Sequence, residues 1–456
     1  MKHRSRRPSA RAGWPCFWNA RVKGWALRYQ AFRRAIKTRS DYRLALKRQG
    51  RRAAYQLQPF HWDLDRKSPR HGDRPFEIAH IDHTQLDIET RCSSTGQLLG
   101  RPWMTLLTDA YSRRVLAVYL TFDEPSYRSS MMALRICVQR HARLPETIVV
   151  DNGKEFESTY FETLLARYEC TKKRRPPAEA RFGSVCERLF GTSNAQFIHN
   201  LQGNTQITRN VRQVTKSVDP RNLAVWTLPD LDRRLSEFVY EIYDTLEHPA
   251  LGQSPRDAFQ SCLARTGQRS LRLIPYDQDF LTSTFPTTRK GTAKISAGRG
   301  VKIHGLYYWH GAFDQPAFAR KQVPVRYDPF DAGKAYAYVG KHWVECCSEL
   351  HWAFCGRSEK EIMLATEELR RRSKRFGQRY CLTRKRLAEF LQSVEAEEAL
   401  HLQRRRDQEI KAIRNSRPTA GPAHSEPTQE NRASELENPS ALSDAPVGVN
   451  EIYAEF

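Results

Sequence analysis

The chain has 456 residues, 39% of them hydrophobic, and a formal net charge of +24. Because single hydrophobic cores stop growing at roughly 250–300 residues, this length predicts more than one domain. No run of about 18 apolar residues occurs and the basic start never becomes apolar, so we expect neither a membrane-spanning helix nor a secretory signal.

The positive charge is concentrated at the start of the chain. Residues 1–52 hold 17 Lys or Arg and a single acid, Asp41. Such clustering fits the phosphate backbone of a nucleic acid better than a merely well-solvated surface. We therefore predict that residues 1–70 form a basic helical segment that contacts DNA, with Arg51 and Arg52 as candidate contacts.

The ten cysteines give no metal or disulfide pattern, because none of them forms a CxxC pair. Cys346, Cys347, His351 and Cys355 lie close together, but adjacent cysteines on a strand point to opposite faces. The set is typical of reduced thiols in a cytosolic protein.

A series of short strands is predicted from Phe76. In "FEIAHIDHTQLDI" the alternation places Asp82 on one face of a strand and His83 on the other. "WMTLLTDAYSRRVLAVYLTF" predicts two more strands around a turn at Asp109, and a helix over 126–141 precedes the strand "ETIVV". This order predicts a sheet that begins antiparallel and continues with a parallel strand.

The fourth predicted strand stops at Asp151, in "VVDNGKEF". Asp-Asn-Gly is common turn chemistry, which would end a strand without further purpose. Alternatively, Asp151 lies at the carboxyl end of a parallel strand, where α/β proteins hold ligands and metals. The local sequence is compatible with both interpretations.

A helix is predicted over 155–167, followed by the basic, proline-broken loop "CTKKRRPPAEARFGS". The next helix, 185–201, carries Cys186 and Phe190 on its apolar stripe, and Glu187 lies about 100° off that stripe. A glutamate at this edge is either a solvated boundary residue or a carboxylate that points into a cleft.

The remaining chain changes character several times. Residues 230–260 add a helix, and the short strands that begin near residue 298 suit a small β-barrel. Charged helices are expected over 358–414, and 415–456 is expected to be a disordered acidic tail. Its apolar end predicts a docking peptide with three candidate contacts, Ile452, Tyr453 and Phe456.

Three acids can meet in this arrangement: Asp82, Asp151 and Glu187. If the first and fourth strands are neighbours, both aspartates lie at one edge and the later helix brings the glutamate to them. Carboxylate oxygens suit Mg²⁺ or Mn²⁺. Two such ions about 4 Å apart catalyse phosphodiester chemistry.

The motifs "IDHTQLD", "GRPWMTLLTDAYSR", "DNGKEF" and the glutamate of "SVCERLFGTSNAQF" resemble the catalytic core of DDE transposases and integrases. The Mu-type branch, with its TnsB-like subunits, is the most similar; "LQGNTQ", "HPALGQSP" and "VPVRYDP" also resemble it. The likeness covers roughly residues 70–350. It implies an α/β fold with an RNase H-like mixed-sheet core over 71–275, a small β-barrel over 285–350, a charged helical region over 351–414 and the tail over 415–456.

The resemblance implies a transposase that cleaves the 3′ strand at transposon ends and joins the 3′-hydroxyl to target DNA. Asp82, Asp151 and Glu187 would be the catalytic residues and would hold two Mg²⁺ or Mn²⁺ ions. The implied partners are DNA, an AAA+ ATPase regulator that engages the C-terminal tail, further copies in a tetramer on DNA, and a possible companion endonuclease. We expect a cytoplasmic, nucleoid-associated protein of bacteria.

Other candidates are weaker. Asn152 could shape the turn or contact DNA, and five basic residues border the expected cleft as phosphate contacts or as solvated charge: Lys172, Lys173, Arg174, Arg175 and Arg181. Since only about 70 residues precede the core, we expect a remnant of the DNA-reading domains usual in this branch. A catalytically silent DNA-binding scaffold and a stand-alone nuclease are the alternative functions.

Overall fold

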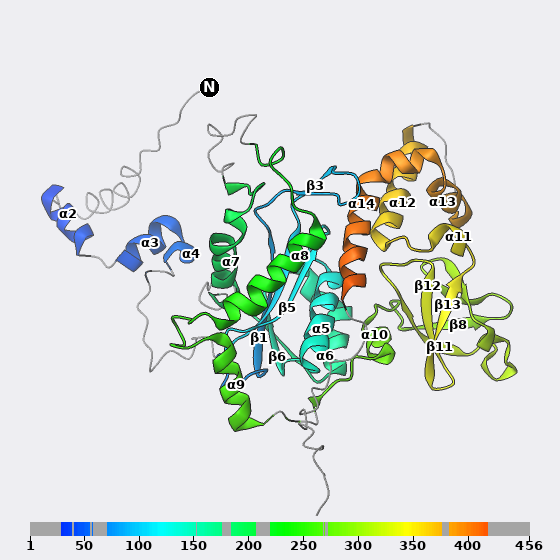
Figure 1. Cartoon of the computed structure of the whole chain (residues 1–456), viewed down its shortest axis with the longest axis horizontal. Helices are drawn as coiled ribbons and strands as arrows, with labels where there is room; N and C mark the ends of the chain where they lie inside the picture. The colour runs from blue at the N-terminus through cyan, green and yellow to red at the C-terminus, as the bar shows by residue number, and fades with distance from the viewer. Residues whose placement is uncertain are drawn as a thin grey trace, which may run out of the picture. The chain divides into compact units, whose positions relative to one another are not determined.

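The computed structural model is shown in Figure 1. It describes residues 29–38, 41–54, 57, 71–151, 153–175, 184–206, 219–267, 269, 272–375 and 383–417. No helix within these ranges is both long and apolar enough to cross a membrane.

The described part of the basic N-terminal segment is helical. It forms α2 (Tyr29–Lys37), α3 (Asp41–Gln49) and α4 (Arg51–Ala54). Helix α3 begins on the acid Asp41 and carries Lys47 and Arg48 in its last turn, which matches the charges to the helix dipole.

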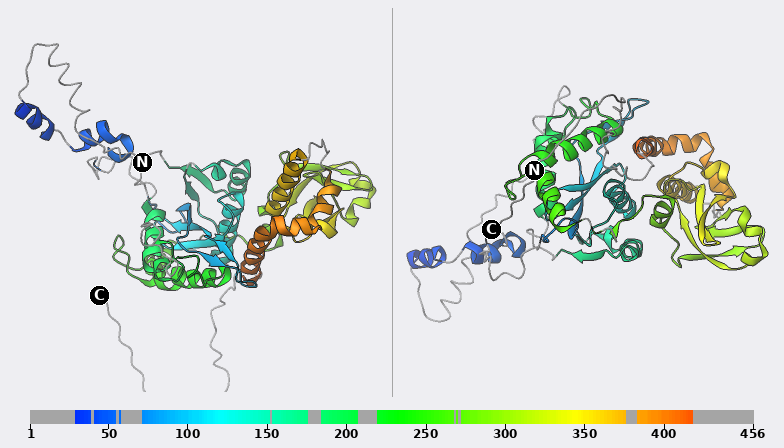
Figure 2. Two further views of the ribbon diagram at one scale, coloured as in Figure 1. Left: turned by 90° about the horizontal axis from the view of Figure 1, so that it is seen from above. Right: turned by 60° about the horizontal axis from the view of Figure 1, so that its bottom comes forward.

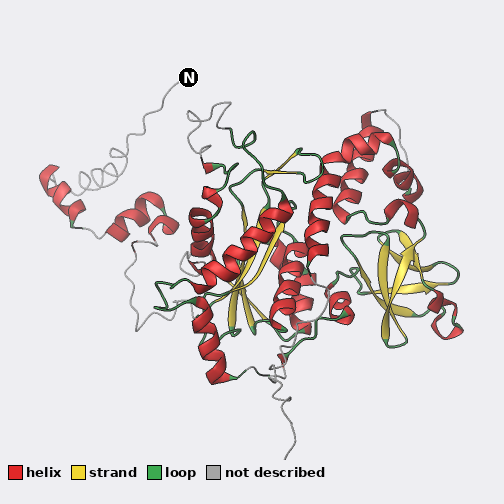
Figure 3. Ribbon diagram, in the orientation of Figure 1, coloured by secondary structure: helices red, strands yellow, loops and turns green. Residues whose placement is uncertain are grey.

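A mixed sheet, with its strands drawn in yellow in Figure 3, forms the centre of the next part of the chain. It has five strands in the order β5-β4-β1-β6-β7. Strand β1 (Ile78–Gln85) pairs antiparallel with β4 (Trp103–Asp109), which pairs antiparallel with β5 (Val115–Thr121). On its other side β1 pairs parallel with β6 (Thr147–Val150), and β6 pairs parallel with β7 (Thr171–Arg174). The predicted sequence of antiparallel and parallel strands is confirmed.

Strand β7 was not predicted, because its sequence "TKKR" lies in what we expected to be a loop. It is an edge strand with mostly exposed side chains, so it lacks an apolar pattern. Its backbone still completes a ladder: Thr171 N–H donates to Glu146 O (2.8 Å), and Arg175 N–H donates to Val150 O (2.9 Å). The hydrogen bonds of the sheet therefore extend to Arg175, which lies beside Asp151.

Helices cover both faces of the sheet (Figure 2). Helix α5 (Tyr127–His141) and α6 (Thr159–Arg167) share one core cluster with Ile81, Leu107 and Ile148. The predicted helix over 155–167 is divided: a 3₁₀ turn, Lys154–Glu157, precedes Ser158, whose hydroxyl accepts from Phe161 N–H and caps α6.

The other core cluster lies against α7 (Ser184–Gln196) and α8 (Leu228–Glu237). Cys186 and Leu189 of α7 pack there with Leu106 of β4, so the predicted apolar stripe of α7 faces the sheet. The small strands β2 (Thr90–Arg91) and β3 (Leu98–Gly100) pair with each other beside this cluster. Two further helices, α9 (Pro255–Thr266) and α10 (Gln278–Thr284), precede the next group of strands.

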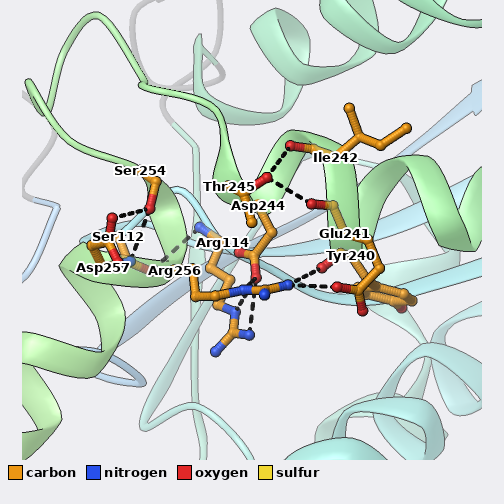
Figure 4. Close-up of polar contacts among 10 residues, drawn as sticks. All are labelled: Ser112, Arg114, Tyr240, Glu241, Ile242, Asp244, Thr245, Ser254, Arg256 and Asp257. Carbon is orange, nitrogen blue, oxygen red and sulfur yellow. Dashed lines mark hydrogen bonds and ion pairs between the residues drawn. The ribbon is translucent and has the colours of Figure 1, made fainter.

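The segment after α8 is fixed by an ion-pair network around Asp244, which Figure 4 shows. The Asp244 side chain is 2% exposed. Asp244 Oδ2 lies 2.9 Å from Arg114 Nη2 and 3.0 Å from Arg256 Nε. Arg256 also donates to Tyr240 O (2.8 Å) and to the exposed Glu241 carboxylate (2.8 Å). The network joins the residue before β5, the turn after α8 and the start of α9.

Six antiparallel strands then form the predicted small barrel, closed in the order β10-β13-β12-β11-β8-β9. Their bounds are Thr292–Ser296, Gly300–Ile303, Leu306–Trp309, Gln322–Tyr327, Lys334–Val339 and His342–Ser348 for β8 to β13. Gly300 adopts φ +78°, and a Cβ there would lie 2.0 Å from Tyr308 O, so the β9–β10 contact requires glycine. Cys346 is buried and Cys347 exposed, as alternation predicts.

Four helices follow the barrel: α11 (His351–Phe354), α12 (Glu359–Arg375), α13 (Arg384–Leu391) and α14 (Val394–Ser416). The last of them, α14, returns to the mixed sheet. Ile410 and Ile413 join the core cluster of α7 and α8. Glu409 Oε1 accepts from Ser93 N–H and from its hydroxyl, both at 2.6 Å.

Candidate active site

Asp82 and Asp151 lie just beyond the paired part of two neighbouring parallel strands, β1 and β6. The pairing ends at His80 and Val149, so each aspartate lies two residues past the last pair, with Asp151 directly after β6. The two carboxylates are close enough that the negative charge of Asp151 contributes to raising the pKa of Asp82.

The Asp82 carboxylate is largely buried, with 14% of its side chain exposed. Burial is the main cause that raises its pKa, and the charge of Arg175 opposes the rise. Each carboxylate oxygen has a donor: His83 N–H lies 2.8 Å from Oδ1, and Arg175 Nη2 lies 2.9 Å from Oδ2. These contacts fix the carboxylate in one orientation.

Asp151 combines both interpretations of its sequence. Its Oδ1 accepts from Gly153 N–H at 2.9 Å, which is the side-chain turn expected of Asp-Asn-Gly. It also stands at the carboxyl end of β6, the strand that pairs in parallel with the Asp82-bearing β1. Forming the turn therefore holds this carboxylate at the sheet edge.

Glu187 lies in the first turn of α7, one residue after the buried Cys186. Cys186 Sγ donates to His80 O at 3.6 Å, which attaches this turn to β1. The Glu187 side chain is 57% exposed, and its Oε1 lies 4.0 Å from Arg175 Nη1. The third predicted acid therefore lies beside the end of the sheet, and Arg175 is its ion-pair partner in the described part of the chain.

Arg175 connects the first and third acids. One terminal nitrogen of its guanidinium lies on Asp82 and the other faces Glu187. The sequence predicted Arg175 only as one of several basic residues bordering the cleft. Recognising β7 as a strand would have placed Arg175 level with Asp151, because it directly follows Arg174 at the end of that strand.

His83 supports the site from the opposite face of β1. Its ring stacks on Phe156, with centroids 5.1 Å apart and an interplanar angle of 14°, and its Nδ1 lies 2.8 Å from Thr105 Oγ1. Burial lowers the pKa of His83 to about 4, so the ring is neutral at pH 7. The ring of His83 therefore packs within the fold, while its backbone N–H donates to Asp82.

The other predicted contacts divide into three groups. Lys172 is used internally, because its ammonium binds the Glu162 carboxylate and donates to Phe156 O (2.9 Å). Lys173 is exposed, and Arg174 pairs with the exposed Glu157 at 3.2 Å. The side chains of Arg51 and Arg52 are outside the described part of the structure. Five further candidates lie entirely outside the described residues: Asn152, Arg181, Ile452, Tyr453 and Phe456.

The residue types of the donor set suit a hard divalent cation, since the candidates are three carboxylates and no thiol or imidazole is required. Among the described residues, however, no group of three or more His, Cys, Asp or Glu side chains is gathered closely enough to hold a metal ion. The position between Asp82 and Glu187 is taken by the cationic guanidinium of Arg175. The residues fit the ion, and this arginine provides the positive charge in its place.

Comparison with known proteins identifies the chain's relatives. Residues 80–144 and 140–203 match the family described as TnsB C-terminal domain, and 286–344 match Mu transposase, C-terminal. The transposase for transposon Tn552 of Staphylococcus aureus is 25% identical over 270 residues, which cover 58% of this chain and 51% of that protein. The chain is a Mu-type relative of the Tn552 and TnsB transposition proteins.

The transposon Tn7 transposition protein TnsB of Escherichia coli is 27% identical over 142 residues, 27% of this chain and 20% of that protein. The matched stretches thus span about half of the Tn552 transposase and a fifth of TnsB. The predicted resemblance to the DDE transposase and integrase core is confirmed, and all three acids lie within the TnsB C-terminal match.

Comparison with solved structures finds integrases at low similarity. The HTLV-2 integrase catalytic core domain in complex with magnesium is 14% identical, with a TM-score of 0.27, and covers 41% of this chain and 99% of its own. The simian T-cell lymphotropic virus intasome in complex with the PP2A regulatory subunit B56 gamma is 17% identical, with a TM-score of 0.31, and covers 69% and 94%.

Proposed function

We propose that this transposase relative cleaves the 3′ strand at transposon ends and joins the freed 3′-hydroxyl to target DNA. The observation that supports the proposal most directly is that Asp82 and Asp151 lie just past the last pair of the parallel strands β1 and β6, close enough for their charges to interact, with Glu187 of α7 on the other side of Arg175. Asp82, Asp151 and Glu187 would hold two Mg²⁺ or Mn²⁺ ions. When bound, such a pair supplies Lewis-acid activation of the attacking oxygen and stabilisation of the leaving oxygen.

The protein's own contribution is position. Asp82 is fixed by the His83 N–H, and Asp151 by its turn to Gly153. Glu187 is exposed in the first turn of a helix whose other face is anchored in the core, so its carboxylate can move toward the aspartates while its backbone stays in place. Two fixed acids and one adjustable acid suit a site that loads its ions together with DNA.

DNA is the proposed substrate and the first partner, in keeping with the high positive charge of the chain. We extend the proposal to a tetramer on paired transposon ends and to an AAA+ ATPase regulator that binds the C-terminal tail. A companion endonuclease that cuts the second strand is compatible with this scheme. These partners rest on the likeness to the transposition proteins.

The test is strand transfer in Mg²⁺ with labelled, pre-cut ends from the element's own flanks. Asp151→Asn and Glu187→Gln should abolish the joined products. Glu157→Gln is the matched control, because it removes a nearby carboxylate that is 48% exposed and lies outside the site. Joined products that persist in Asp151→Asn would overturn the proposal.

Two other outcomes would assign a different function. DNA binding without joining, even with the regulator ATPase present, would make the protein a silent scaffold. Hydrolysis of DNA without joined products would make it a stand-alone nuclease.

A further inference from the structure

Arg175 occupies an unusual position in the candidate site. Its side chain is 13% exposed, as enclosed as the Asp82 carboxylate that it binds at 2.9 Å. Its second terminal nitrogen faces Glu187 at 4.0 Å. The guanidinium thus lies between two of the acids to which the proposed function assigns metal ions.

The backbone of Arg175 is fixed while its side chain is long. Its N–H donates to Val150 O at 2.9 Å, so the residue continues the β6–β7 ladder next to Asp151. An arginine side chain has several rotatable bonds beyond this fixed point. It can therefore leave the acids by rotation alone, without any change in the strand.

The positive charge of Arg175 affects how a metal ion can bind to Asp82. A guanidinium stays protonated at every physiological pH, so Arg175 cannot release the acids by losing a proton. A divalent cation that binds Asp82 must consequently push this positive charge away.

We propose that Arg175 is a built-in counter-ion of the acid site, which divalent metal displaces and a DNA phosphate then receives. Before DNA binds, the arginine neutralises Asp82 and weakens metal binding. When a phosphate is near, the guanidinium gains a bidentate anionic partner and the acids become free for metal. Metal and DNA therefore strengthen each other's binding. This inference rests on the proposed function.

The experiment measures Mn²⁺ binding to the full chain by electron paramagnetic resonance, with and without a short DNA duplex. In Arg175→Gln without DNA, the Kd for Mn²⁺ should fall about tenfold relative to the unaltered protein. The duplex should lower the Kd of the unaltered protein by about the same factor and leave that of Arg175→Gln nearly unchanged. Arg175→Lys, which keeps the charge and loses the fork, should lie between the two.

Arg167→Gln is the matched control. It removes an arginine that is exposed in the last turn of α6, and its Mn²⁺ binding should equal that of the unaltered protein. A structural role would lower thermal stability alone. We instead expect Arg175→Gln to melt at lower temperature in EDTA and to recover with Mn²⁺, because the ion replaces the lost charge.

The outcomes separate this inference from the function on which it rests. If Asp82→Asn abolishes Mn²⁺ binding but Arg175→Gln binds no more tightly than the unaltered protein, the counter-ion role is wrong and the metal site stands. If Asp82→Asn binds Mn²⁺ as well as the unaltered protein does, in the presence of DNA, the metal site itself is wrong, and the inference falls with it.

Discussion

The imidazole of His83 stacks on the phenyl ring of Phe156, with the two centroids 5.1 Å apart. His83 follows Asp82 on β1, and Phe156 follows Asp151 in the 3₁₀ turn after β6. Phe156 is 1% exposed, so the contact is part of the core. The stack therefore joins the segment that carries Asp82 to the turn that follows Asp151.

The first prediction concerns this stack. Phe156→Leu keeps the site apolar and should cost no more than about 1.5 kcal/mol of unfolding free energy. It removes the flat face under His83, so Asp151 is less well placed and strand transfer should fall about tenfold or more. Denaturant titration and single-turnover joining assays measure the two effects.

Phe161→Leu is its control. Phe161 is equally buried and contacts Phe156 edge-on, at 5.5 Å between centroids, but no ring contact joins it to His83 in the described structure. A similar loss of stability with normal joining is expected. Equal loss of joining in both variants would show that the stack has no special role.

The second prediction concerns the ion-pair network of Figure 4. Asp244→Asn removes a carboxylate charge that is shared by Arg114 and Arg256, and leaves both guanidinium groups without their common partner. The unfolding free energy should fall by about 3 kcal/mol, as for other broken buried pairs. Glu241→Gln touches the same Arg256 from a position that is 67% exposed, and should change stability by less than about 0.5 kcal/mol. Equal effects of the two substitutions would refute the distinction.

The third prediction is a loss of stability in acid caused by His141. Burial is the main cause that lowers the pKa of His141, to about 3, while the unfolded chain keeps the ordinary value near 6.5. Below pH 6.5, His141 is therefore protonated in the unfolded state but stays neutral in the folded state. The contribution of His141 is fully present above pH 6.5 and is lost, at about 1.4 kcal/mol per pH unit, as the pH falls toward 3.

His141→Leu tests this linkage. The ring lies against Phe76 and Phe259, and its Nε2 has no hydrogen-bond partner among the described residues, so an apolar side chain of similar size is suitable. Between pH 6 and 4, the slope of unfolding free energy against pH should decrease by the amount that corresponds to about one bound proton. An unchanged slope would place the titration elsewhere.

The sequence predicted most of the sheet because its central strands are apolar and alternate. It placed Asp82 and Asp151 at one edge of the sheet on the condition that the first and fourth predicted strands are neighbours, and β1 does pair with β6. The polar edge strand β7 was missed, because an exposed strand gives no apolar period and is held by backbone hydrogen bonds to β6.

Contacts between residues far apart in the sequence could not be predicted either. Arg175 and Asp82 are 93 positions apart, and the pairing depends on β7 lying beyond β6 at the sheet edge. Asp244 reaches Arg114 across 130 positions. Hydrophobic periodicity describes one element at a time. It predicts which face of a helix or strand is buried, but not which charged side chain of a neighbouring element it will contact.

The last prediction separates two adjacent lysines of β7. Lys172 is occupied within the fold by Glu162 and by Phe156 O, whereas Lys173 is exposed and, by alternation, lies on the same face of the strand as Arg175. Lys173 is therefore the better placed of the two to contact a phosphate beside the acids. Lys173→Ala should weaken DNA binding at all sequences and reduce the slope of log K against log salt by about 1.

Lys172→Ala should leave that salt slope unchanged, because a lysine already paired with a carboxylate releases no counter-ion on binding DNA. Its effect should instead appear as reduced thermal stability of the segment around Phe156. Fluorescence anisotropy with a labelled duplex at several salt concentrations measures both slopes. If Lys172→Ala changes the slope and Lys173→Ala does not, the DNA runs along the opposite face of β7, away from Asp82 and Arg175, and the proposed path of the DNA past the acids is wrong.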